Sequence, residues 1–143
     1  MIEKVVENWH RQLRGEYPGG LDELLADDVV FYSPVVFTPQ KGKDITKAYL
    51  NAAFNTFDGD SGSEKRAEQG PKKFEYTKQV LSGNQAVLEF ETEMDGKYVN
   101  GVDIISCNDE GRIVEFKVMI RPLQAVNKVH QQMATMLKAM QGS

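Results

Sequence analysis

Apolar residues recur at helical spacing near the start of the chain. From residue 2 to about residue 15 they follow the spacing of one helix face: Ile2, Val5, Val6, Trp9 and Leu13. This spacing predicts an amphipathic helix, which the sequence Pro18-Gly19-Gly20 should end. A short second helix is predicted from Gly20 to Ala26, because leucines stand at positions 21, 24 and 25.

Two further helices are predicted along the chain. One begins after Gly42, with Asp44 as its N-cap, and its wide apolar face indicates that it is covered on more than one side. The other follows Pro122, and one of its sides carries the apolar residues Val126, Val129, Met133, Met136, Leu137 and Met140. The polar stretch 58–72 is predicted to be a loop. It lacks the glycine and the glutamate of a calcium loop, because Ser63 and Gln69 stand there.

Strand patterns fill most of the remaining sequence. β-branched and aromatic residues predict a short strand at 29–32. Four longer strands are predicted at 74–81, 86–93, 97–107 and 112–121, with Asp95-Gly96 as a strong hairpin signal. Helices followed by an antiparallel run of strands predict an α+β fold. A curved sheet wrapped around a long helix would form a cone open at one end, and such a cone can hold a ligand.

Composition limits the chemistry of the chain. Its 143 residues suit one domain, and a net charge of -4 argues against nucleic acid or an anionic membrane as a partner. One cysteine and two histidines exclude a disulfide scaffold and a cysteine-rich zinc site. We therefore predict no metal and no cofactor. The sequence shows neither a signal peptide nor a membrane span, which predicts a cytoplasmic protein with Cys107 reduced.

One acidic residue lies within an otherwise apolar strand. Asp103 stands between Val102 and Ile104, and alternation places it on the same face as Ile105 and Cys107. Apolar surroundings desolvate a carboxylate and raise its pKa. Such a group can donate a proton or a hydrogen bond at neutral pH. The alternative is a buried aspartate that is paired with a donor and maintains the shape of the cone.

Three segments of the sequence resemble the nuclear transport factor 2-like superfamily, most closely its SnoaL-like and ketosteroid-isomerase-like branch: LDELLADDVVFYSP at 21–34, KGKD at 41–44 and GVDIISCNDEGRIVEF at 101–116. The resemblance covers about residues 2–122. It implies a cone domain at 1–122, with residues 123–143 as an added amphipathic helix packed on that domain or on a dimer partner. This fold hosts enzymes, binding modules and transport adaptors.

The resemblance also assigns residues to the ketosteroid isomerase site. Those enzymes use an aspartate base, together with a tyrosine and a protonated aspartic acid that bind the developing oxyanion. The resemblance places Asp103 at the protonated acid, Trp9 at the tyrosine and Ser33 at the base. A serine without an adjacent base cannot take a proton from a carbon acid at neutral pH. This argues against steroid isomerisation unless Tyr32 or a residue elsewhere supplies the base, and leaves Asp103 as the acid–base group of a cyclase-type reaction.

The residues that we expect to bind a ligand are Trp9, Tyr32, Ser33, Phe54, Phe90 and Phe116. The indole of Trp9 can donate a hydrogen bond but not accept one, and core packing is its alternative role. Tyr32 and Ser33 should point to opposite faces, and the resemblance favours Ser33 for the pocket. His10 and His130 are expected to be solvated.

Three functions remain open. The first is a SnoaL-like protein that holds a small apolar, oxygen-bearing molecule in the cone, with Asp103 as acid or hydrogen-bond donor in an isomerase- or cyclase-type reaction. The second is a binding module without chemistry, and the third is a protein-interaction adaptor. The missing base at Ser33 shifts weight from the first toward the second, and the first stays the main expectation. A homodimer is expected through the outer face of the last strand, where Met119 stands among charged residues.

Overall fold

The computed structural model describes residues 1–57 and 74–141, apart from the side chains of 54–57, 136, 137 and 139–141. The predicted loop at 58–72 therefore lies outside the described residues. The helices are α1 (Ile2–Leu13), α2 (Gly20–Leu24), α3 (Lys43–Phe57) and α5 (Leu123–Gln141). The strands are β1 (Leu25–Tyr32), β2 (Gln40–Lys41), β3 (Glu75–Ser82), β4 (Gln85–Met94), β5 (Lys97–Cys107) and β6 (Ile113–Arg121).

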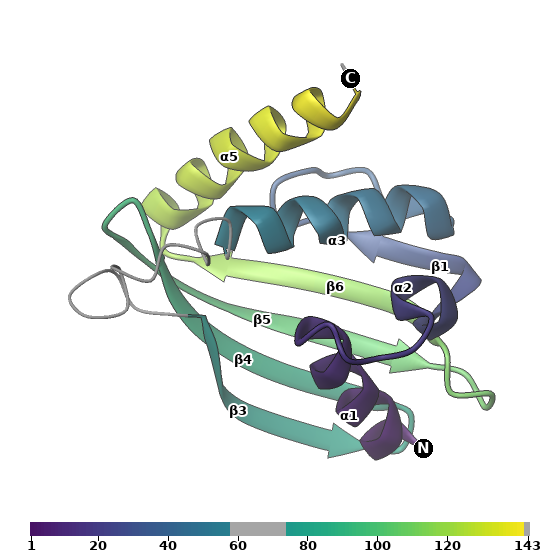
Figure 1. Cartoon of the computed structure of the whole chain (residues 1–143). Coiled ribbons are helices and arrows are strands. Elements are labelled where there is room, and N and C mark those ends of the chain that lie inside the picture. Colours follow the sequence, from purple (N-terminus) through teal and green to yellow (C-terminus); the bar gives the residue numbers. More distant parts are fainter. Residues whose placement is uncertain (58–73, 142–143) are drawn as a thin grey trace.

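The strands form one curved sheet in the order β2-β1-β6-β5-β4-β3. Strands β3 to β6 form the predicted antiparallel run, and β1 lies parallel to β6. The described helices lie on the inner side of the curve, with α1 over β3 to β5 and with α3 and α5 at the other end (Figure 1). The α+β cone is thus confirmed.

Alternation along the central strands divides the sheet into an inner and an outer face. On β4 the inner residues Ala86, Leu88, Phe90 and Thr92 are buried, whereas the residues between them are partly exposed. On β5 the inner face carries Gly101, Asp103, Ile105 and Cys107, as the sequence pattern predicts. Phe90 pairs directly with Gly101, and Leu88 pairs with Asp103. The residues between these positions on β4 and β5 form the outer face, together with the residues of β6 that pair with them, such as Met119 opposite Val102.

Two apolar clusters make up the core. One joins α1 and α2 to the sheet and includes Trp9, Phe31 and Phe116. The other joins α5 to α3 and β4, and includes Phe90, Val129 and Met133. Burial of each such side chain contributes about 1.5–3 kcal/mol. Tyr49, Tyr76 and Val118 pack against both clusters, so the two clusters meet in the middle of the cone.

Helix α5, the expected added helix, packs on its own chain through the buried residues Ala125, Val129 and Met133. Lys128 adds an ion pair of 2.9 Å with Asp95 in the turn between β4 and β5. Met136 and Met140 lie outside the described side chains. None of the helices formed by the described residues is both long and apolar enough to span a bilayer.

Candidate functional site

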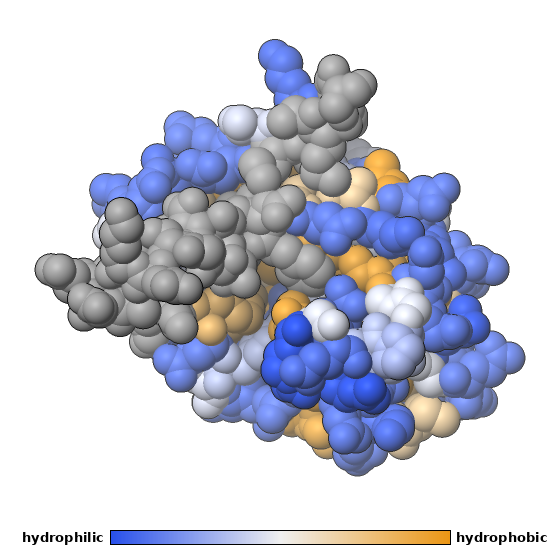
Figure 2. Space-filling view, in the orientation of Figure 1, coloured by the Kyte–Doolittle hydropathy of each residue, from blue (hydrophilic) through white to orange (hydrophobic). Residues whose placement is uncertain are grey.

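A cavity of about 430 Å³ lies where the two apolar clusters meet. Its wall combines residues of α1, α3 and α5 with the inner face of the sheet. Among the described residues, six Phe, Tyr and Trp side chains line it: Trp9, Phe31, Phe74, Tyr76, Phe90 and Phe116. On the face of the molecule seen in Figure 2, most of the surface is hydrophilic, and apolar surface shows between α1 and α3. A concave, mostly apolar space of this size is typical of small-molecule sites.

The aromatic rings at one end of the cavity hold one another in place. Phe74 stacks on Phe90 with ring centroids 4.8 Å apart, and Tyr76 meets Phe74 edge-on at 5.2 Å. Gly101 makes room for this arrangement, because a Cβ on Gly101 would lie 2.6 Å from Cζ of Phe90. Trp9 and Phe116 contact each other at 4.9 Å. These rings give the cavity flat apolar walls.

A chain of hydrogen bonds crosses the cavity wall. Nε1 of Trp9 donates to the Tyr76 hydroxyl at 3.0 Å, and that hydroxyl donates to Oδ2 of Asp103 at 2.5 Å. No hydrogen bond joins Oδ1 of Asp103 to any other described residue. Because Asp103 lines the cavity, this second oxygen is the one left for a bound molecule.

Burial sets the protonation of this chain. Asp103 is only 6% exposed, and desolvation raises its pKa to about 7, although the hydrogen bond from Tyr76 acts in the opposite direction. Burial, together with the nearby Asp103 charge, also raises the pKa of Tyr76 well above its usual value. Near neutral pH, Asp103 therefore exists in both its neutral and its charged form. The neutral form can donate a hydrogen bond or a proton from Oδ1.

Polar residues of α1, of its C-cap and of β3 border the cavity. His10, Arg14 and Glu75 belong to its lining. Nε2 of His10 lies 3.1 Å from Oε1 of Gln79, and the imidazole meets the Tyr76 ring edge-on at 5.4 Å. His10 is half-buried, so its side chain is less solvated than expected, because it packs against Tyr76 and bonds Gln79 on β3. His130 is exposed, as expected.

Two of the expected ligand-binding residues lie elsewhere. Ser33 and Tyr32 border a shallow surface depression beside α5. The Ser33 hydroxyl accepts a hydrogen bond from the backbone N–H of Val35 at 3.1 Å, and Nζ of Lys117 lies 4.9 Å from the centre of the Tyr32 ring. Strand β1 ends at Tyr32, so the alternation expected to turn Ser33 inward stops before it.

The structure brings Trp9, Phe90, Phe116 and Asp103 together around the cavity. Phe54 belongs to α3, but its side chain lies outside those described. Tyr76 was not among the expected residues. Its only sequence signal is alternation with Phe74 on a predicted strand. Burial raises the pKa of the Cys107 thiol, which disfavours the nucleophilic thiolate. The described residues contain no cluster of three or more side chains suited to a metal ion.

Comparison with known proteins places this cavity in a fold family. No protein-family model and no curated protein matches the chain. A steroid delta-isomerase from Pseudomonas aeruginosa is similar, with 27% identity, a TM-score of 0.83, and coverage of 99% of this chain and 95% of that one. An uncharacterised protein with a cystatin-like fold from Silicibacter pomeroyi has 23% identity, a TM-score of 0.74, and coverage of 92% and 83%.

A third similar structure is from Jannaschia and is named as a SnoaL-like polyketide cyclase. It has 14% identity and a TM-score of 0.62, with coverage of 89% of this chain and 92% of that one. The fold is thus that of a cystatin-like cone. The chain therefore shares the nuclear transport factor 2-like fold, and the structures similar to it include a steroid delta-isomerase and a SnoaL-like cyclase, as its sequence motifs predict.

Proposed function

We propose that this protein binds a small apolar molecule bearing a carbonyl or hydroxyl oxygen, and that Asp103 donates a hydrogen bond to that oxygen. The observation that carries this proposal is the hydrogen-bond chain from Trp9 through Tyr76 to Asp103 in the wall of a largely apolar cavity. A buried carboxyl in such a place is costly unless it is hydrogen-bonded. A ligand oxygen at Oδ1 would satisfy it.

The walls support a flat ligand. The stacked pair Phe74 and Phe90 and the edge-on Tyr76 offer surfaces that suit fused rings. Val129 and Met133 of α5 close the cavity from the other side, so we include the added helix in the site. The similar steroid delta-isomerase is consistent with such a ligand. Because Ser33 lies outside the cavity, we do not extend steroid isomerisation to this chain.

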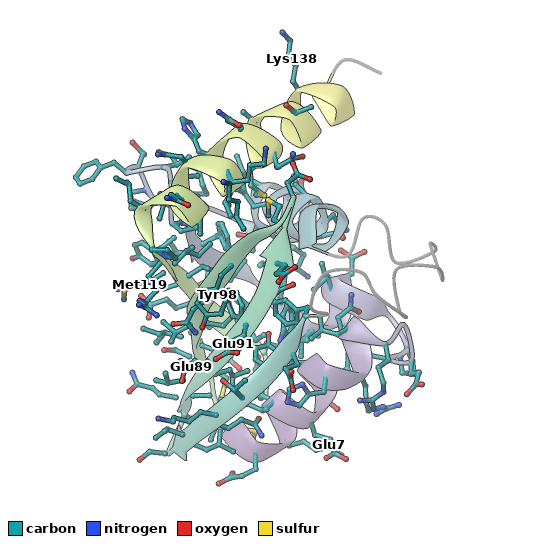
Figure 3. All side chains as sticks on the ribbon, turned by 90° about the vertical axis from the view of Figure 1, so that its left-hand side faces the viewer. Glu7, Glu89, Glu91, Tyr98, Met119 and Lys138 are labelled. Carbon is teal, nitrogen blue, oxygen red and sulfur yellow. The ribbon has the colours of Figure 1, made fainter. Side chains whose placement is uncertain are left out.

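The outer face of the sheet supports a second proposal, a two-fold homodimer. Tyr98 and Met119 are 43% and 50% exposed there, and Figure 3 shows them with Glu89 and Glu91 on the side of the sheet opposite α1. Between them Asn100 is buried, and it bonds Glu89 at 3.0 Å and Arg121 at 3.2 Å. Exposed apolar side chains that stand among charged ones suit a self-complementary interface.

A matched pair of ligands tests the binding proposal. 2-Tetralone and tetralin share a fused-ring body, but only 2-tetralone has a carbonyl oxygen. Trp9 is the single tryptophan of the chain and lines the cavity, so its fluorescence reports binding, with calorimetry as a check. We expect Asp103→Leu to weaken the binding of 2-tetralone about tenfold, which corresponds to about 1.4 kcal/mol. The affinity for tetralin should stay unchanged.

Two results would contradict the proposal. If neither ligand changes the fluorescence or releases heat, the cavity does not bind this class of molecule. That result would favour the function of a protein-interaction adaptor. If Asp103→Leu weakens both ligands equally, Asp103 shapes the cavity and does not bind the oxygen. Asp103→Asn provides the matched control, because an amide can still donate to a carbonyl.

A further inference from the structure

We propose that His10 is the proton acceptor of this cavity, and that it removes a proton from the carbon next to a bound carbonyl whose oxygen is held by Asp103. This inference rests on the proposed function, because it requires the carbonyl to lie at Asp103. It would supply the base that Ser33 does not.

The position of His10 supports this role. Helix α1 places it directly after Trp9, and both residues line the cavity. The imidazole meets the ring of Tyr76 at 5.4 Å, and the hydroxyl of that same tyrosine bonds Asp103. One aromatic ring therefore separates His10 from the donor. A flat ligand lying along this ring can have its oxygen at Asp103 and an adjacent carbon toward His10.

The hydrogen bond to Gln79 prepares the imidazole to accept a proton. Nε2 of His10 lies 3.1 Å from Oε1 of Gln79, and an amide oxygen can only accept. Nε2 therefore carries the hydrogen, and Nδ1 of the neutral ring keeps its lone pair. Gln79 lies on β3, on the same inner side as Tyr76, so the strand that holds Tyr76 also orients His10.

The other titratable groups of the described lining are less suited to accept a proton. Arg14 stays charged and carries no acceptor atom. Tyr76 donates its hydroxyl hydrogen to Asp103, and neutral Asp103 is the donor proposed for the ligand oxygen. Glu75 is exposed, and it stands between Phe74 and Tyr76, which face the cavity. Among these residues, His10 is the one whose second ring nitrogen is left to accept a proton beside Tyr76.

The proposed step balances without a co-reactant. The C–H bond next to the carbonyl breaks, and its proton goes to Nδ1 of His10. The electron pair forms a carbon–carbon double bond, and the carbonyl π pair moves onto oxygen, where the hydrogen on Oδ1 of Asp103 stabilises the enolate. The imidazolium then returns a proton to a carbon of the enolate. In D₂O the imidazolium exchanges this proton for a deuteron from the solvent before it returns one, so the carbon gains deuterium.

The test follows deuterium entering 2-tetralone, measured by proton NMR against a buffer blank. We expect the wild-type protein to catalyse exchange next to the carbonyl and His10→Gln to slow it about a hundredfold. Binding of 2-tetralone by Trp9 fluorescence should change less than twofold. Exchange by His10→Ala should recover when imidazole is added, which a structural role would not produce. His130→Gln, outside the cavity, should exchange like the wild type.

Each other outcome overturns a defined part of the argument. If 2-tetralone binds and exchanges equally fast in His10→Gln, His10 is not the base, although the binding proposal stands. If it binds without exchange above the blank, the cavity is a binding site and the base proposal is wrong. If it does not bind to the wild-type protein, the proposed function fails, and the role of His10 fails with it.

Discussion

The hydroxyl of Tyr76 bonds Asp103 across an intervening strand. Tyr76 lies on β3 and Asp103 on β5, and β4 separates the two strands in the sheet. The bond therefore requires the correct register of three strands at once. It occupies Oδ2 of Asp103 and leaves Oδ1 toward the cavity.

Replacement of Tyr76 by phenylalanine should raise the pKa of Asp103 above its value of about 7. The hydroxyl stabilises the charged carboxylate, so its removal favours the neutral acid. The variant should also lose about 1–3 kcal/mol of stability, because buried Oδ2 loses its donor. Carbon-detected NMR of the Asp103 carboxyl measures the pKa. A midpoint equal to or below the wild-type value would contradict this account, and Tyr17→Phe, outside the cavity, serves as control.

Asp103→Asn should stabilise the protein more at pH 8 than at pH 4. The pKa of Asp103 rises from 3.8 to about 7 on folding, so between these values the folded state keeps a proton that the unfolded state releases. Wild-type stability then falls with rising pH by up to about 1.4 kcal/mol per unit and levels off above pH 7.

Urea unfolding between pH 4 and pH 8.5 measures this difference for the wild type and Asp103→Asn. The stability that Asp103→Asn gains over the wild type should grow from pH 4 to about pH 7 and then become constant. A gain that is independent of pH would mean that the asparagine improves packing only. Asp28→Asn, at an exposed position, controls for the loss of one negative charge.

Gly101→Ala should destabilise the fold by about 1–3 kcal/mol through overpacking. The added Cβ would lie 2.6 Å from Cζ of Phe90 and 2.6 Å from the backbone oxygen of Met119. The Phe90 ring would have to move toward the cavity, so 2-tetralone should also bind more weakly. Urea unfolding of the single variants and of Gly101→Ala with Phe90→Leu measures the coupling. We expect the double variant to regain part of the lost stability, because the smaller leucine relieves one clash while the Met119 oxygen cannot move away. If the destabilisations of the two single variants simply add, the added Cβ does not clash with Phe90.

Met119→Asp should convert the proposed dimer into a monomer. Met119 is half-exposed on the outer face, and at a two-fold interface the substitution would introduce two negative charges. Sedimentation velocity at several protein concentrations measures the change. Phe37→Ser, which removes a fully exposed ring outside that face, should leave the dimer intact. An unchanged sedimentation coefficient in Met119→Asp would exclude this face as the interface.

The local pattern of apolar, polar and turn-forming residues predicted much of the fold. The predicted bounds of β5 at 97 and 107 are confirmed, because the turn at Asp95 and Gly96, where both residues have positive φ, fixes where the strand begins. The early start of β1 was missed. Leu25 pairs with Ile113 in the parallel ladder to β6, and such a long-range pairing leaves no periodic signal near Leu25.

The candidate site was predictable only in part. Asp103 stands out in the sequence because it is a single carboxyl in an apolar strand. Tyr76 does not, because its contact with Asp103 depends on the order of the strands and on an irregular register next to it in β3. The position of His10 likewise depends on how far the sheet curves over α1, which no local pattern encodes.

The meeting of two apolar clusters around a cavity has a consequence for stability. Side chains of both clusters line the space between them, so a molecule that fills it would act as one more core residue and join the two halves. Binding to the folded state alone then raises the unfolding free energy, by about 2.7 kcal/mol at a concentration one hundred times Kd. The melting temperature of this protein therefore reports whether a compound fills the cavity, and a compound library can be ranked by the rise in melting temperature that each member causes.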